Sequence, residues 1–265
     1  MSVWDFCGVK PQVTRLSHPA KRVLLVGNSL LFYNCGVNSM VGGFARAAGV
    51  RMSVAMAAIG GASLYWHDVK SYLRPDAIRS YAFSSDGKNT LTFLESEEGK
   101  VFDAVLLCDS SQGPVHPDLK GRFQKAAAKD CAIVREAGAT PLLLVTWGYA
   151  DRPGMTRELA DSIVTTANEN RCLAVPCGLA FEESRRLRPA LRLIRSDNRH
   201  PTVAGTYLEA AVLAAVLSGV SPVGADFYGR FDDLVLSKED GRFLQEVAWN
   251  TVTEFFGWVV SGETS

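Results

Sequence analysis

Residues 23–36 read VLLVGNSLLFYNCG. Four apolar residues run directly into Gly27, Asn28 and Ser29, after which the chain turns through polar residues and becomes helical in character. A short, continuous apolar run bounded by turn residues is typical of a strand that is covered on both faces. The stretch therefore predicts a buried parallel strand that ends at the carboxyl edge of a sheet, where α/β proteins bind their ligands.

Further apolar runs follow the same pattern. They lie at residues 52–58, 103–108, 141–146 and 172–176. Segments with a helical period separate them, as in residues 118–138, where Gly138 is a typical C-terminal stop. This alternation predicts an α/β fold, in which helices cover both faces of a parallel sheet through right-handed crossovers.

One region breaks the alternation. Residues 81–93 read YAFSSDGKNTLTF, with aromatic and apolar residues on either side of an Asp86-Gly87 turn signal. This pattern predicts a β-hairpin inserted at residues 76–95, between the second and third strands. Two amphipathic or apolar helices are expected after residue 200. The chain is thus expected to form a single domain over residues 1–265, with residues 1–20 as an N-terminal lead.

The bulk composition sets broad limits on function. The chain has 265 residues, of which 28 are Lys or Arg and 28 are Asp or Glu. This balance gives no global field that would favour nucleic acid or an anionic membrane, so a small, roughly neutral partner is expected. No segment is apolar enough over ~18 residues to span a membrane, and no signal peptide is evident, which predicts a cytoplasmic protein.

The six cysteines show no metal-site or redox-motif spacing and are expected to be free thiols. They stand at positions 7, 35, 108, 131, 172 and 177. Cys172 and Cys177 are interpreted as small core residues. The sequence predicts no metal and no cofactor.

Ser29 has three possible roles when this stretch is taken alone. It is a helix N-cap, a ligand for a phosphate, or a nucleophile. Phosphate binding is the weakest of the three, because the stretch lacks the GxxxxGK and GxGxxG patterns. The GxSxG elbow of α/β-hydrolases is absent as well, since position 31 is Leu. Capping and catalysis stay open at this point.

A serine nucleophile needs a base, and that base needs an orienting acceptor. His200 lies in RSDNRHPTVAG, residues 195–205, with Asp197 three positions before it. The alternative interpretation is a solvated turn in which Asp197 or Asn198 caps the next helix. The placement favours a catalytic group, because Ser29 and His200 are both expected at the carboxyl edge of one sheet. The other histidines are His18, His67 and His116.

The segments GNSLLFYN, residues 27–34, and DNRHPTVAG, residues 197–205, resemble the first and last sequence blocks of the SGNH, or GDSL-type, hydrolase superfamily. The resemblance implies a flavodoxin-like three-layer α/β/α sandwich with a central five-stranded parallel sheet. It also implies that Ser29 is the nucleophile, His200 the base and Asp197 its acid. Members of the superfamily are esterases, lipases, thioesterases and carbohydrate O-deacetylases.

The same resemblance implies an oxyanion hole, with one departure from the family pattern. Its donors would be the N–H of Ser29 and the N–H of a glycine after the second strand, for which Gly60 and Gly61 both qualify and Gly61 is favoured. The third block of the family supplies an Asn, but here the third strand leads into CDSSQGP. Gln112 is expected to replace it, with Ser110 as the alternative. The combination resembles an uncharacterised bacterial subgroup, so no substrate carries over.

Substrate contacts are expected from residues beside these blocks. Asn28, which stands where the family commonly has Asp, is one of them. Trp147 and Tyr149 directly follow the fourth strand, where their rings would stack on a sugar or pack an acyl chain, although Trp147 could equally belong to the core. Tyr33, Tyr65 and Trp66 are also expected near the mouth of the site, although Trp66, in the expected helix SLYWHDVK (residues 63–70), is interpreted as a core residue.

The sequence thus predicts a serine esterase that hydrolyses a small acyl ester, with an O-acetylated carbohydrate as one candidate. The alternative from a different class is a catalytically silent, flavodoxin-like module that binds an anion or a carbohydrate. Cys108, at the end of the third strand, is an alternative nucleophile. A homo-oligomer is compatible with the apolar C-terminal helix, whose Phe255 and Phe256 would cover either their own core or that of a neighbour.

Overall fold

A computed structural model describes residues 2–83, 85–152 and 154–259 of the chain. Its centre is a five-stranded parallel sheet with the strand order β2-β1-β5-β6-β7. Its strands are β1 (Arg22–Gly27), β2 (Ser53–Ala58), β5 (Ala104–Leu107), β6 (Thr140–Leu144) and β7 (Leu173–Val175). Each strand falls within or beside an expected apolar run. The predicted parallel sheet is confirmed.

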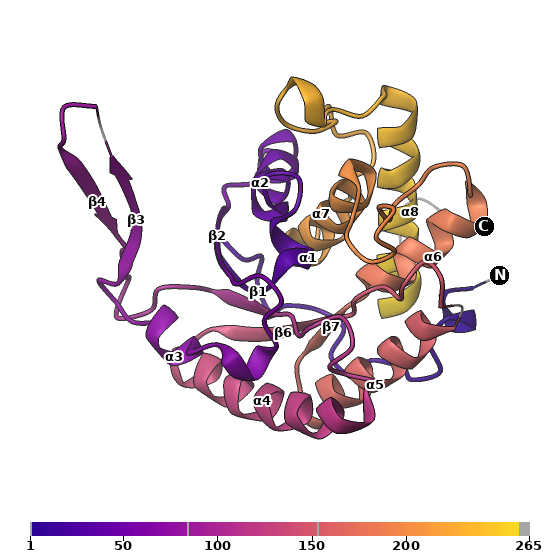
Figure 1. The fold of residues 1–265 in the computed structure, drawn as a ribbon, viewed down its shortest axis with the longest axis horizontal. Coiled ribbons are helices and arrows are strands. Elements are labelled where there is room, and N and C mark those ends of the chain that lie inside the picture. Colours follow the sequence, from indigo (N-terminus) through magenta and orange to yellow (C-terminus); the bar gives the residue numbers. More distant parts are fainter. Residues whose placement is uncertain (1, 84, 153, 260–265) are drawn as a thin grey trace.

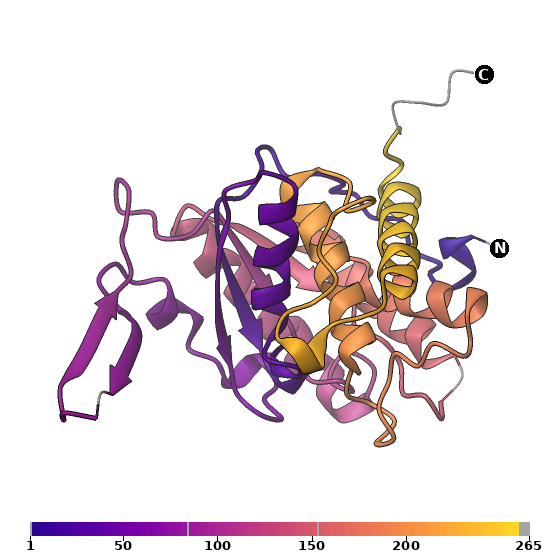
Figure 2. The same cartoon turned by 90° about the horizontal axis from the view of Figure 1, so that it is seen from above.

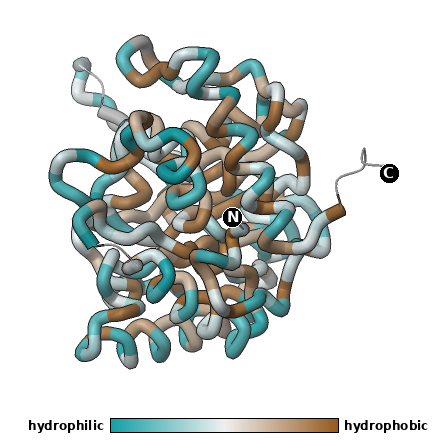
Figure 3. Tube along the Cα trace, turned by 90° about the vertical axis from the view of Figure 1, so that its right-hand side faces the viewer, coloured by the Kyte–Doolittle hydropathy of each residue, from teal (hydrophilic) through white to brown (hydrophobic). Residues whose placement is uncertain are grey.

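Helices cover both faces of the sheet (Figure 1). On one face lie α2 (Val37–Ala47), α7 (Val203–Ser218) and α8 (Lys238–Phe256). On the other lie α4 (Pro117–Glu136) and α5 (Met155–Glu169), and α6 (Cys177–Leu187) packs against α7 and α8. The expected three-layer sandwich is thus confirmed. Figure 3 shows hydrophobic residues concentrated in the interior and hydrophilic ones along the outer turns.

The helix α7 is almost completely buried. All of its residues from Ala204 to Ser218 are buried, because it is apolar on every side and lies between the sheet, α2 and α8. Phe255 and Phe256 of α8 are buried in the core of the same chain, and Trp4 stacks on Phe255 at 5.7 Å. These rings therefore cover their own core.

Among the residues that the structure describes, none of the helices has the length and apolar character needed to span a membrane.

The expected hairpin is formed by β3 (Ile78–Phe83) and β4 (Asn89–Phe93), which pair antiparallel with Tyr81 opposite Leu91. Residue 84, within the turn region of the predicted hairpin, lies outside the described residues. The hairpin forms a separate two-stranded sheet that projects from the body of the molecule (Figure 2).

The segment SLYWHDVK, expected as one helix, is instead a 3₁₀ turn, Leu64–Trp66, followed after a break by the short helix α3 (Val69–Tyr72). In 3₁₀ geometry residues three apart lie on the same side, so Leu64 and His67 both face inward. Trp66 is consequently 57% exposed. The interpretation of Trp66 as a core residue was wrong.

The strand order places a topological switch point between β1 and β5. From β1 the chain passes to β2 on one side, whereas β5 and the strands that follow it lie on the other. At such a point the connections diverge and leave a crevice outside the carboxyl ends of the strands. The short helix α1 (Ser29–Phe32), the Gly60-Gly61 loop and the CDSSQGP segment all begin at this edge.

Candidate active site

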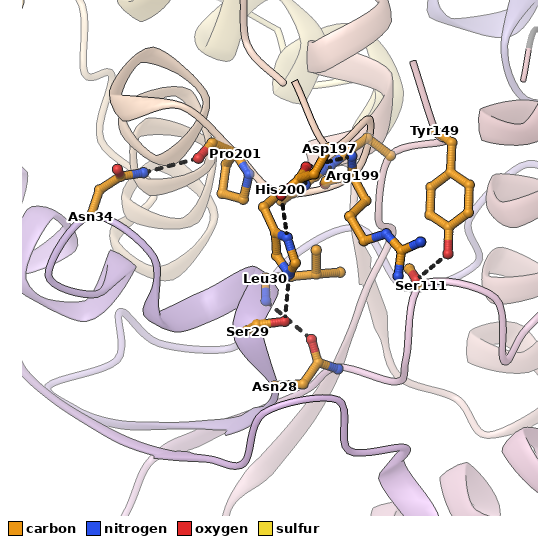
Figure 4. Close-up of polar contacts among 11 residues, drawn as sticks. Asn28, Ser29, Leu30, Asn34, Ser111, Tyr149, Asp197, Arg199, His200 and Pro201 are labelled. Carbon is orange, nitrogen blue, oxygen red and sulfur yellow. Dashed lines mark hydrogen bonds and ion pairs between the residues drawn. The ribbon is translucent and has the colours of Figure 1, made fainter. Parts of the chain in front are cut away.

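The side chains of Ser29, His200 and Asp197 form one hydrogen-bonded chain at the switch point (Figure 4). Ser29 is the first residue of α1, and its Oγ lies 2.9 Å from His200 Nε2. His200 Nδ1 lies 2.8 Å from Asp197 Oδ2. Because an ionised carboxylate can only accept, the proton sits on Nδ1, and Nε2 is left to accept from the serine hydroxyl.

Asp197 is held in its ionised form. Desolvation opposes ionisation, but the backbone N–H groups of His200 and Arg199 both donate to Oδ1 at 3.0 Å, and the imidazole donates to Oδ2. These hydrogen bonds outweigh desolvation and lower the pKa of Asp197 to about 2. The three-residue spacing makes this possible, because it closes a tight turn in which Asp197 caps the residues that lead to His200.

His200 is fixed in place from a second direction by Tyr33. The two rings are stacked, with centroids 4.2 Å apart and an interplanar angle of 11°. Tyr33 is the C-terminal cap of α1, so the helix that carries Ser29 also supplies the surface on which the imidazole rests. The serine and the histidine are thus positioned by one short element.

One side-chain amide, of Asn34, and one indole, of Trp147, hold the His200 loop at this edge. Asn34 Nδ2 donates to the carbonyl of Pro201 at 3.1 Å and to Thr206 Oγ1 at 2.8 Å. Trp147 Nε1 donates to the carbonyl of Arg199 at 2.8 Å. The loop that carries Asp197 and His200 is therefore attached both to α1 and to the end of β6.

The Asn28 side chain, just after β1, forms hydrogen bonds with the segments that follow β2 and β5. Its side chain is 3% exposed, and its Nδ2 donates to the carbonyls of Ala62 and Asp109, each at 3.0 Å. Its Oδ1 accepts from the N–H of Leu30 at 3.1 Å and caps α1. All three polar contacts of the amide are made within the protein, which contradicts the expectation that Asn28 binds substrate.

The loop after β2 contains a backbone N–H, that of Gly61, without an acceptor among the described residues. Its turn is closed by the N–H of Ile59 donating to Gly27 and the N–H of Ala62 donating to Ile59. Gly61 adopts φ 73°, which glycine adopts without strain, and it is exposed. Among the described residues, no group accepts a hydrogen bond from the N–H of Gly61 or of Ser29. Both are available to an oxyanion.

The first acidic residue of the CDSSQGP segment, Asp109, is buried behind the site. Asp109 is 5% exposed and accepts from the N–H of Leu64 at 2.6 Å, which anchors the end of the Gly61 loop. Burial raises the pKa of Asp109. The Ser63 hydroxyl donates to Ser110 at 3.1 Å. Gln112 is half-buried, and its oxyanion role stays a prediction.

Structure comparison provides the relatives of this arrangement. A protein described as "a putative SGNH hydrolase from Slackia heliotrinireducens" matches with a TM-score of 0.55 at 23% identity, over 75% of this chain and 100% of its own. A DUF4886 family protein from Bacteroides uniformis matches with a TM-score of 0.61 at 18% identity, over 92% of this chain and 98% of its own. An acetyl xylan esterase, AlAXEase, matches with a TM-score of 0.51 at 15% identity, over 72% and 97% of the two chains.

The chain has the fold of the SGNH hydrolases. This likeness is structural: no family model matches the sequence. No curated protein matches the sequence either. The resemblance first noted in two short motifs is thus matched by a likeness in fold.

Within this SGNH fold, the two aromatic residues expected at the substrate have other contacts. Trp147 is 2% exposed and stacks on Phe181 of α6, with centroids 4.1 Å apart, so its expected stacking on a substrate was wrong. Tyr149 is 9% exposed, and its hydroxyl lies 2.8 Å from Ser111 Oγ. Tyr149 lines the edge of the site through its hydroxyl and the ring face that Arg199 covers.

The other candidate groups are occupied elsewhere in the SGNH fold. Cys108 is fully buried and burial raises the pKa of its thiol well above the ordinary value, which argues against a nucleophilic role. His67 is 3% exposed and bonds the carbonyl of Gly27 at 2.9 Å; burial lowers its pKa. His116 caps α4. No cluster of His, Cys, Asp or Glu suited to a metal ion occurs among the described residues.

Asp109 and Asn34 were not predicted as parts of the site framework, and the stacking of Tyr33 on His200 was not predicted either. Asp109 and Asn34 act on backbone groups of distant loops, for which a single sequence has no signal. Tyr33 did have a signal, because its place four residues after Ser29 puts it at the end of a one-turn helix.

Proposed function

We propose that this protein is a serine esterase in which Ser29 is the nucleophile, His200 the general base and Asp197 the group that orients it. The observation that supports this most directly is the continuous hydrogen-bonded chain, with 2.9 Å and 2.8 Å contacts, at the switch point of the sheet. Turn or capping serines have no need of a histidine that is itself oriented by an ionised carboxylate. The N-cap of α1 is Asn28, so capping does not account for Ser29.

The proposed reaction is two-step acyl transfer. His200 Nε2 takes the Ser29 proton as Oγ attacks the ester carbonyl, and the resulting imidazolium donates that proton to the departing alcohol oxygen. Water then attacks the acyl-enzyme with His200 again as base, which releases the acid and restores the Ser29 hydroxyl. Asp197 holds the proton on Nδ1 throughout and stabilises the imidazolium charge.

The oxyanion would be received by the N–H groups of Ser29 and Gly61. Both N–H groups lack acceptors within the described protein. The Gly61 loop is anchored before Gly61 by the N–H of Ile59, which donates to Gly27, and after it by Ala62 and Leu64. Such preorganised donors stabilise charge that develops in the transition state without reorganising. Gln112 is the proposed third donor.

The proposed substrate is a small acyl ester, with an O-acetylated carbohydrate as the leading candidate. One structural relative is named as an acetyl xylan esterase, although at 15% identity that likeness extends only to the fold. The site lies at an exposed edge, where Phe32, on the same short helix as Ser29, is 37% exposed. An exposed aromatic ring beside the nucleophile suits the flat face of a sugar ring.

The direct test is hydrolysis of p-nitrophenyl acetate and butyrate by the wild type and by Ser29→Ala. The variant is expected to lose nearly all activity, on the order of 10³-fold or more. Ser96→Ala is a matched control, because Ser96 is exposed and precedes Glu97, which pairs with Arg22 at the far end of β1. A fluorophosphonate should label Ser29 in the wild type, as read by peptide mass spectrometry. Equal rates for wild type and Ser29→Ala would refute the assignment and favour a silent binding module.

A further inference from the structure

Two arginines lie near the proposed catalytic histidine. The guanidinium carbon of Arg195 lies 5.5 Å from the centre of the Tyr33 ring, which itself stacks on His200. The guanidinium carbon of Arg199 lies 5.1 Å from the centre of the Tyr149 ring. Figure 4 shows the Arg199 side chain beside His200, with its guanidinium directed toward Ser111 and Tyr149.

Both arginines are anchored through the same turn that orients His200. The N–H of Arg195 donates to the carbonyl of His200 at 2.8 Å. The N–H of Arg199 donates to Asp197, and the carbonyl of Arg199 accepts from Trp147. A guanidinium that rests on an aromatic face is stabilised by the ring and keeps its in-plane N–H donors free. The two cations are therefore positioned relative to the reacting atoms.

The two guanidinium groups are not engaged by acids. Within the described residues, neither Arg195 nor Arg199 forms an ion pair, whereas Arg186 and Arg188 pair with carboxylates at 2.5–3.3 Å. The nearby Asp197 accepts from His200, and Asp151 accepts from Asn198. Two cations beside the site are thus left for a ligand, which differs from the neutral partner expected from the overall composition.

The position of the arginines indicates which part of the substrate they meet. In acyl transfer the protonated histidine delivers its proton to the leaving alcohol, so that alcohol must lie against His200. The proposed oxyanion donors are the N–H groups of Ser29, just after β1, and of Gly61, in the loop after β2, whereas His200 lies in the loop before α7. Groups that flank His200 therefore face the alcohol portion and not the acyl chain.

We propose that Arg195 and Arg199 select esters whose alcohol portion carries an anionic oxygen group, a carboxylate or a phosphate. This inference rests on the proposed function and specifies its substrate class: the acyl group of an acidic alcohol, such as an acylated acidic sugar, is removed. A guanidinium presents paired donors that match both kinds of anion.

The test compares kcat/KM for 4-acetoxybenzoate and 4-acetoxyphenyl phosphate with that for the neutral methyl 4-acetoxybenzoate. In Arg195→Gln and Arg199→Gln the anionic-to-neutral ratio is expected to fall about tenfold or more relative to wild type, since a hydrogen bond to a charged group is typically worth that much. The ratio should also fall in the wild type as salt is added. The two anions distinguish carboxylate from phosphate selectivity.

The matched control is Arg15→Gln. Arg15 also rests on an aromatic ring, Trp258, at 4.4 Å, but it lines a cavity with Gly219 at the far end of α7 from His200. The anionic-to-neutral ratio of kcat/KM in Arg15→Gln should equal that of the wild type. An unchanged ratio in both site variants, with neutral-ester hydrolysis still dependent on Ser29, would overturn the arginine proposal and leave the esterase intact. A drop confined to an ester with the carboxylate on the acyl side, such as 4-nitrophenyl hemisuccinate, would overturn it too.

A binding measurement separates this inference from the esterase proposal. Calorimetry on Ser29→Ala should show that 4-hydroxybenzoate, the anionic alcohol product, binds more tightly than methyl 4-hydroxybenzoate, and that adding Arg199→Gln removes the difference. This result would support the arginine site even if no ester were hydrolysed. Equal affinity for the two alcohols would overturn it.

Discussion

The ring of Tyr33 lies nearly parallel to the imidazole of His200, with the ring centroids 4.2 Å apart, although the two residues are far apart in the sequence. The contact limits rotation of the imidazole about the Ser29 and Asp197 hydrogen bonds. A stacked aromatic pair is typically worth about 0.5–1.5 kcal/mol beyond its buried area.

We therefore expect Tyr33→Ala to lower kcat by about two- to tenfold. Tyr33→Phe keeps the ring and should stay within about twofold of the wild type. Steady-state kinetics on p-nitrophenyl acetate, with thermal melts of both variants, checks this. If Tyr33→Phe lost as much kcat as Tyr33→Ala, the hydroxyl and not the stacked ring would be responsible.

Asn28 stands where an Asp is common in the family that this chain resembles, and its environment accounts for the amide. Its Nδ2 donates to two carbonyls, and a carboxylate at that position would face both oxygens without a donor. Asn28→Asp should lower the free energy of unfolding at about pH 7 by roughly 2–4 kcal/mol, and lower activity as the Ser29 turn loosens.

Urea denaturation of Asn28→Asp measures this, with Asn250→Asp as the control because Asn250 is exposed on α8. Acidification should restore part of the lost stability, since a protonated carboxyl can donate one hydrogen bond. A variant as stable as the wild type at neutral pH would show that the two carbonyls do not require the amide.

The sandwich could be predicted because its central strands are buried on both faces and therefore read as continuous apolar runs. The Asp86-Gly87 turn located the hairpin in the same direct way. The segment that contains Trp66 was misread, because one-turn helices have too few residues to establish a period, and the inward turn of His67 depends on the carbonyl of Gly27.

The geometry of Ser29, Asp197 and His200 was accessible from sequence for a topological reason: parallel strands bring their carboxyl ends to one edge. Sequence does not tell which way a side chain turns at that edge. Trp147 follows β6 as expected, but it turns inward to Phe181 and holds the Arg199 carbonyl. The buried Asp109 could not be anticipated, because its partner is a backbone N–H on another loop.

Asp197→Asn tests the orienting role of the carboxylate. The backbone N–H groups of Arg199 and His200 would keep the amide oxygen on their side, so the amide nitrogen would face His200 Nδ1 and force the proton onto Nε2. That tautomer cannot accept from Ser29, and kcat should fall about 10²- to 10⁴-fold. Since the pKa of Asp197 is about 2, its carboxylate is ionised at every assay pH above about 4.

The control for Asp197→Asn is Asp151→Asn, because Asp151 contacts the same loop only through Asn198 at 3.1 Å. It should leave kcat nearly unchanged. Both variants are compared in p-nitrophenyl acetate hydrolysis, and comparable losses in the two would indicate a general loosening of the loop.

Asp130 gives a prediction for stability that is independent of the site. It is 1% exposed on α4, its Oδ1 has no hydrogen-bond partner among the described residues, and burial raises its pKa to about 6. Between about pH 4 and pH 6 the folded state retains a proton that the unfolded state has lost. The free energy of unfolding therefore falls as pH rises, and the loss is complete above about pH 6.

The Asp130→Asn side chain is neutral at every pH, so this variant should be more stable than the wild type by about 1–3 kcal/mol at about pH 7.5, with little difference at about pH 4. Urea midpoints at both pH values, with exposed Asp118→Asn on the same helix as control, measure it; parallel pH profiles for Asp130→Asn and wild type would mean that Asp130 is ionised in the folded protein without penalty.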